Sequence, residues 1–270
     1  MSAAGPAQAR KSAPARSPTH GPDPALVPEP APGSVRFFTL LYAAPERRGA
    51  LRTLLALADE IGAGLGRRLD HGVAHVRLDW WQQEAQRLAA GHPAHPWLIA
   101  RQREPASALD LTPLIDAAAI DLASERLAGS ASRQLPQALF VQAARVLTAG
   151  TPAAALADQQ EAMIGALGRA VDALERPPGD SSDRPQEAGA LQAGPSRLEP
   201  SLQRALAPLL VWAALAARQA RRRERRVAKK SSTITGSMFD GLIDNLVAWH
   251  AARAAQRGRF RLEDLQGMGK

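Results

Sequence analysis

The 270-residue chain contains no cysteine, which excludes disulfides, Cys-ligated zinc, iron–sulfur clusters and thiolate catalysis. It also lacks a Gly-x-Ser-x-Gly nucleophile turn, a Walker phosphate loop and a His-Glu-x-x-His zinc motif. Local motifs therefore assign no enzyme class to this protein.

Long apolar runs are missing as well. The longest, residues 205–217, has thirteen residues, whereas a membrane-spanning helix needs roughly 20. We therefore expect a cytoplasmic protein without a transmembrane segment. Aromatic residues make up only 4% of the chain, and the apolar residues are mostly Ala and Leu, which favour helices over strands. The composition predicts an all-α fold.

Apolar residues recur at intervals of three and four, the spacing of one helix face. This pattern and its Pro and Gly boundaries predict helices over residues 45–69, 73–90, 111–128, 136–147, 152–174, 199–229 and 239–256, with a short one after Pro96. Residues 1–34 are rich in Ala, Pro, Ser and Gly and predict a disordered tail. The rest, residues 35–270, reads as one helical domain with a flexible Pro/Gly/Ser loop at 177–197.

Positive charge is concentrated in one block. Residues 218–230 contain six Arg and two Lys against one Glu, which is +7 of the chain's net charge of +8. The block has no aromatic residue for base stacking, which argues against nucleic acid as a partner. It is either a solvated helix end or a contact with an anionic membrane, and its basic residues are Arg218, Arg221, Arg222, Arg223, Arg225, Arg226, Lys229 and Lys230.

Two groups of side chains have spacings that could hold a metal ion. Asp240 and Asp244 lie one helical turn apart and form a candidate Mg²⁺ pair, although paired carboxylates bind Mg²⁺ only loosely without substrate phosphates. His71, His75 and Asp79 form a row on one helix face, which lacks a converging ligand from elsewhere. For both groups a solvated helix face is the simpler interpretation.

Several segments resemble the squalene/phytoene synthase family. They are residues 34–48 and 50–57, the Trp-Trp-x-x-Glu of residues 80–84, and the Gly-x-Pro-x-His-Pro of residues 91–96. The resemblance implies an isoprenoid-synthase-like helical bundle around a central apolar cavity. It also suggests Arg36 as a contact for a diphosphate, and as cavity-lining residues Phe37, Phe38, Tyr42, Trp80 and Trp81.

The chemistry of this family requires Mg²⁺ ions held by two opposed carboxylate motifs against a leaving diphosphate. By the resemblance, the first motif falls on Gly62, Ala63 and Gly66, so its carboxylates are absent, and the Arg that usually precedes it is replaced by Asp59. The Pro/Ser connector stands in place of the second motif. The nearby acid pairs, which lack its signature, are Asp158 with Glu161 and Asp172 with Glu175.

Three hypotheses follow. The first is a catalytically degenerate family member, without a cofactor, that binds an isoprenoid or a protein partner. The second is an active Mg²⁺-dependent prenyl diphosphate transferase with rearranged acids, for which Asp240 and Asp244 are the candidates. The third is a membrane or RNA tether through the basic block, which would place the protein at the periphery of the inner membrane.

Overall fold

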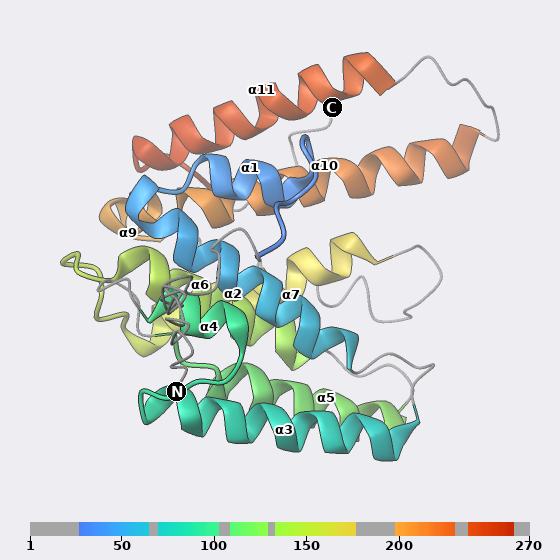
Figure 1. The fold of residues 1–270 in the computed structure, drawn as a ribbon. Coiled ribbons are helices and arrows are strands. Elements are labelled where there is room, and N and C mark those ends of the chain that lie inside the picture. Colours follow the sequence, from blue (N-terminus) through green and yellow to red (C-terminus); the bar gives the residue numbers. More distant parts are fainter. Residues whose placement is uncertain are drawn as a thin grey trace, which may run out of the picture.

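The computed structural model describes residues 27–64, 70–102, 109–128, 133–176, 198–229 and 237–261 (Figure 1). Within these ranges every regular element is a helix, as the composition predicts. The helices are α1 (Val35–Leu41), α2 (Pro45–Ala63), α3 (His71–Ala89), α4 (Pro96–Arg101), α5 (Thr112–Ala128), α6 (Gln134–Thr148), α7 (Asp158–Glu175), α9 (Pro200–Ala205), α10 (Ala207–Lys229) and α11 (Ser237–Gln256). None of the helices in the described ranges has the length and apolar content needed to cross a bilayer.

Local sequence signals set several helix starts. The Ser34 hydroxyl accepts the backbone N–H of Phe37 at 3.1 Å at the start of α1, and the Asp70 carboxylate accepts the N–H of Gly72 at 2.8 Å at the start of α3. Helix α2 begins at Pro45, whose missing N–H has no partner in a first turn. The starts of α2 and α3 agree with the predicted helices to within two residues, whereas α1 was not among the predicted helices.

Three predicted helices differ from the structure. The predicted helix 45–69 is shorter, since α2 ends at Ala63 and Gly64 is its C-cap. The predicted helix 152–174 begins only at Asp158, because Thr148, Thr151 and Ala154 form successive backbone turns ahead of it. The predicted helix 199–229 is two helices, α9 and α10, which are separated at Leu206. Pro208 explains the break, since it has no N–H to donate to the preceding turn.

The chain is also packed ahead of the predicted domain start at residue 35. Val27 is buried, and the Glu29 carboxylate forms an ion pair with Arg52 of α2. Residues 27–34 therefore contact the helical body, while residues 1–26 and the predicted loop at 177–197 lie outside the described ranges.

The helices form three tiers (Figure 1). Helices α10 and α11 lie on one side with α1 and α9 beside them, α2, α6 and α7 form the middle tier, and α3 and α5 lie on the opposite side. Helix α6 is central, since it contacts α2, α5, α7, α9 and α10. The first half of α10 is buried on all sides, which explains why residues 209–217 are apolar without periodicity.

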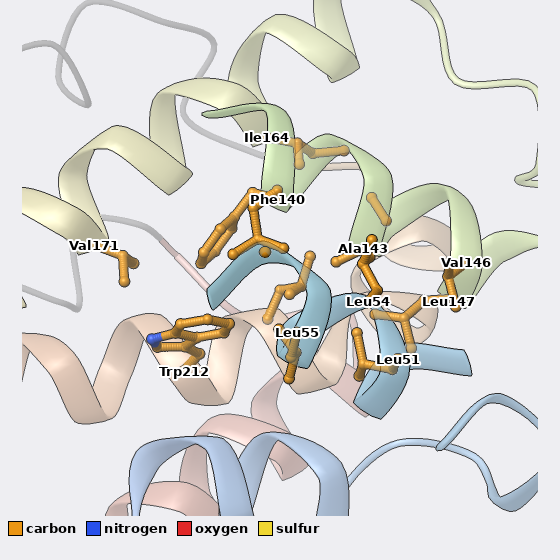
Figure 2. Packing of buried hydrophobic residues seen from close by; sticks show 14 of the residues in the cluster. Leu51, Leu54, Leu55, Phe140, Ala143, Val146, Leu147, Ile164, Val171 and Trp212 are labelled. Carbon is orange, nitrogen blue, oxygen red and sulfur yellow. The ribbon is translucent and has the colours of Figure 1, made fainter. Parts of the chain in front are cut away.

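The core lies where α2, α6, α7 and α10 meet (Figure 2). Leu51 and Leu54 of α2 pack near Ala143 and Leu147 of α6, and the rings of Phe140 and Trp212 face one another with centroids 5.1 Å apart. Helices α6 and α7 approach closely because Gly168 has no side chain. A Cβ atom at this position would lie 2.4 Å from the Pro136 carbonyl oxygen.

The adjacent Trp80 and Trp81 on α3 have different surroundings, because neighbouring helical residues point about 100° apart. Trp81 is 3% exposed and stacks near His95 with ring centroids 5.4 Å apart, whereas Trp80 is 40% exposed and lies under the Arg87 guanidinium. Below them, the fully buried Glu84 accepts the backbone N–H groups of Ala94 and His95. The Trp-Trp-x-x-Glu segment thus attaches α3 to the turn that precedes α4.

Candidate functional site

A pocket of about 470 Å³ lies between the middle tier and α10. Six helices and the residue before α6 contribute its lining, which combines an apolar base with a charged rim. The lining residues are Arg36, Ala58, Asp59, Gly62, Ala63, Asp121, Arg133, Leu135, Pro136, Leu139, Phe140, Gly168, Val171, Asp172, Glu175 and Trp212.

The α2 wall of this pocket is small and uncharged where the family resemblance expects carboxylates. Gly62 and Ala63, two of the three positions assigned to the first Asp-rich motif, both line the pocket. The third position, Gly66, lies outside the described residues. Neither Gly nor Ala has a side-chain oxygen for a cation, so this wall offers no metal ligand at those positions.

Arg36 reaches the pocket from α1 and is already paired. Its guanidinium forms a bidentate ion pair with the Asp59 carboxylate and lies over the Trp212 ring, 5.6 Å from the centroid. Burial lowers the pKa of Arg36, and the nearby Glu175 carboxylate opposes that shift. Arg36 therefore lines the pocket with its charge balanced by Asp59.

The α7 wall is acidic. Glu175 accepts a hydrogen bond of 2.7 Å from the indole N–H of Trp212, and Asp172 forms an ion pair with Arg176 one turn later on the same helix. Burial raises the pKa of Glu175, an effect that the Trp212 hydrogen bond and the charge of Arg36 partly offset. This wall faces an α2 wall that has only Asp59 as a carboxylate.

Asp121 of α5 has a structural role at the edge of the pocket. Its two carboxylate oxygens accept the backbone N–H groups of Gln134 at 2.5 Å and Leu135 at 3.0 Å, at the first turn of α6. Burial raises the pKa of Asp121, and these two hydrogen bonds act in the opposite direction. Because both oxygens hold the α6 amides, Asp121 is poorly placed to become a metal ligand.

The five aromatic residues expected to line the cavity are absent from the lining of this pocket. Phe38 and Trp81 are packed in the core, Trp80 is on the surface, and Phe37 lines a different, shallower hollow beside α2. Tyr42 packs against the core at the end of α1. Their hydrophobicity stabilises the fold, and the aromatic rings of the pocket are Phe140 and Trp212.

The candidate Mg²⁺ pair is engaged in ion pairs between α10 and α11. Asp244 pairs with Arg218 at 2.5 Å, and Asp240 pairs with Arg222. Neither acid lines the pocket. Their helical spacing therefore matches two Arg residues on the neighbouring helix, and both acids lie away from the pocket.

Several Arg side chains of the basic block interact with other helices of the protein. Arg218 and Arg222 neutralise the α11 acids, and Arg223 donates to the carbonyl oxygens of Leu174 and Glu175 at the end of α7. Arg221 is half-buried and Arg225 is exposed. The side chains of Arg226 and Lys229, and all of Lys230, lie outside the part of the chain that the structure describes. Much of the block thus serves helix packing.

His71 and His75 form a contact of 2.9 Å between their Nε2 atoms on the exposed side of α3. The described residues contain no group of three or more His, Asp or Glu side chains arranged to hold a metal ion. The row that also includes Asp79 is therefore not a metal site in this arrangement.

Residues singled out in the sequence that line the pocket are Arg36, Asp59, Gly62, Ala63, Asp172 and Glu175, whereas Phe140, Trp212 and Asp121 were not among the candidates. Trp212 sits inside an apolar run that predicts only a buried helix, and Asp121 has no partner with a recognisable spacing.

Searches of protein-family models, curated proteins and solved structures found no match to this chain.

Proposed function

We propose that this chain is a catalytically degenerate relative of the squalene/phytoene synthases, with an isoprenoid-synthase-like bundle, that binds an uncharged isoprenoid in the pocket between α2 and α7. The observation that carries the proposal is the asymmetry of the pocket. Asp172 and Glu175 line one wall, while Gly62 and Ala63 stand opposite, where a synthase would need its other carboxylates. One acidic wall does not hold Mg²⁺ ions on both sides of a diphosphate.

The charge of the pocket favours a neutral ligand over a diphosphate. Its lining has four carboxylates, Asp59, Asp121, Asp172 and Glu175, against two guanidinium groups. One of those two, Arg36, is neutralised by Asp59. A diphosphate would meet Glu175 in a partly buried site in which Arg36 and Arg176 already pair with Asp59 and Asp172, and this is unfavourable at low dielectric without a metal ion to compensate its charge.

The size and the apolar base suit a short isoprenoid chain. A volume of about 470 Å³ lies within the range of pockets that enclose one small molecule, roughly 300–1,000 Å³. Phe140, Leu139 and Val171 offer apolar contacts at the base, and the Trp212–Glu175 hydrogen bond provides a polar group beside which a hydroxyl can be placed. A terpene alcohol combines these two properties.

The test compares binding of farnesol and farnesyl diphosphate to the full chain by equilibrium dialysis. We expect saturable binding of farnesol, and weakening by about tenfold or more in Ala63→Phe, because the added ring fills the pocket. Ala123→Phe is the matched control, since Ala123 is exposed on α5 and is not part of the lining. Equal farnesol binding by the two variants would place the ligand elsewhere.

A measurement of diphosphate release distinguishes a catalytically degenerate protein from an active prenyltransferase. The full chain is incubated with farnesyl or geranylgeranyl diphosphate and Mg²⁺, beside a known synthase in the same buffer. We expect no release above a boiled sample, because the α2 wall lacks carboxylates at the two described motif positions. Mg²⁺-dependent release that Asp172→Asn abolishes would overturn the proposal and show an active prenyltransferase.

A further inference from the structure

Helix α11 is apolar on two opposite sides. Its inner side packs on α10 through four buried Ala residues, namely Ala248, Ala251, Ala252 and Ala255. On its outer side Leu242 is 60% exposed, Leu246 56% and Trp249 44%. These three recur at intervals of four and three, so they form one stripe along the outermost helix of the bundle (Figure 1). A helix that is apolar on both sides normally has a covering layer on each.

The charged side chains of the described residues 245–261, which include the stripe's second half, are all positive. The two acids of α11, Asp240 and Asp244, are turned to α10, where Arg222 and Arg218 neutralise them. From residue 245 to residue 261 the chain has no Asp or Glu. The same segment has four exposed Arg side chains, Arg253, Arg257, Arg259 and Arg261.

The apolar stripe and the exposed Arg side chains meet at Trp249 and Arg253. The Arg253 guanidinium lies over the Trp249 ring, 4.9 Å from its centroid, and both side chains are exposed. Trp beside Arg at the edge of an apolar stripe is the side-chain combination that lies at the boundary between lipid headgroups and acyl chains. We propose that the outer face of α11 rests on an anionic lipid surface, with Leu242, Leu246 and Trp249 among the acyl chains and the Arg side chains at the headgroups.

The charge pattern favours a lipid surface over a second copy of the chain. Two copies that paired along this stripe would bring their Arg clusters to the same interface without a carboxylate in residues 245–261 to offset them. An anionic membrane supplies the missing negative charge, and each Arg near it strengthens binding about fivefold. The contact differs from the tether expected at residues 218–230, since Arg218, Arg222 and Arg223 of that block are held inside the protein.

Helix α3 provides a matched comparison. Val73, Val76 and Trp80 are exposed there too and recur at intervals of three and four, with Trp80 at 40%, close to the value of Trp249. However, the exposed side chains of His75, Asp79 and Gln83 lie among them, so this surface is broken by polar groups and has a carboxylate in it. We expect this surface to stay in water.

The experiment is sedimentation of the full chain with vesicles of phosphatidylcholine, with or without one-third phosphatidylserine. We expect binding to the anionic vesicles, reduced by about tenfold or more in Leu246→Ser/Trp249→Ser and changed less than about twofold in Trp80→Ser. Arg253→Gln/Arg257→Gln should weaken binding to anionic vesicles by roughly twentyfold and leave binding to neutral vesicles unchanged. Circular dichroism checks that each variant is folded.

Two results would overturn the proposal. One is wild-type binding that Leu246→Ser/Trp249→Ser leaves unchanged, or no binding of the wild type to anionic vesicles at all. The other is a dimer, detected by light scattering, that Leu246→Ser/Trp249→Ser dissociates while vesicle binding persists, since the stripe would then be covered by a second copy. Neither result depends on what the pocket binds, because the stripe residues do not line it.

Discussion

Replacement of Glu84 tests whether the Trp-Trp-x-x-Glu segment of residues 80–84 stabilises the fold. Glu84 is fully buried on α3 and accepts three hydrogen bonds, from the backbone N–H of Ala94 at 2.8 Å, the backbone N–H of His95 at 2.7 Å and the Arg87 side chain at 2.8 Å. The first two bonds fix the turn that leads into α4 and place His95 beside Trp81. The carboxylate thus joins two segments ten residues apart.

The magnitude follows from the groups that lose their partner. Glu84→Ala leaves two amide donors beneath α3 without an acceptor, at about 1–3 kcal/mol each. Arg87 is partly exposed, so water replaces most of its interaction and the ion pair adds little. We expect the free energy of unfolding to fall by about 4 kcal/mol, which is the sum of the contributions from the two amide donors.

Urea and thermal denaturation measure this loss. A fall of about 4 kcal/mol lowers Tm by roughly 8–16 °C in a chain of this size, and the near-ultraviolet circular dichroism of Trp81 should weaken with it. Glu84→Gln keeps one carbonyl acceptor and should lose about half as much, while Arg87→Ala, the control, should lose less than about 1 kcal/mol. A Glu84→Ala protein within about 1 kcal/mol of the wild type would refute the reasoning.

Two further predictions concern packing and pH. Gly168→Ala should destabilise the fold by about 1–3 kcal/mol or more in urea, because its Cβ would lie 2.4 Å from the Pro136 carbonyl oxygen; Gly241→Ala has no atom within 4 Å of its Cβ and should stabilise by about 0.5–1 kcal/mol. The raised pKa of Glu175 means that the folded chain keeps a proton that the unfolded chain has lost. Its contribution to stability therefore falls as pH rises from the ordinary value of 4.5 through the higher folded value. Glu175→Gln should remove that part of the slope of unfolding free energy against pH, and an identical slope in both proteins would contradict the assignment.

The helices could be predicted from the sequence because their signals are local. Apolar spacing and the Pro at residue 45 act within one or two turns, and they predicted the start of α2 and the bounds of α3 and α5 to within two residues. Trp80 and Trp81 divide between surface and core, as the 100° step between adjacent helical residues requires.

The pocket and the ion pairs depend on the tertiary structure. Arg36 meets Asp59 and Trp212 across 23 and 176 residues of chain, and Asp244 meets Arg218 across 26. Local spacing in the sequence does not show which distant residues come into contact. For this reason an acid pair on α11 suggested a metal site, and aromatic residues near α1 suggested a cavity wall. Helical periodicity establishes which side of a helix is apolar; the packing of helices far apart in sequence decides whether that side meets core, pocket or solvent.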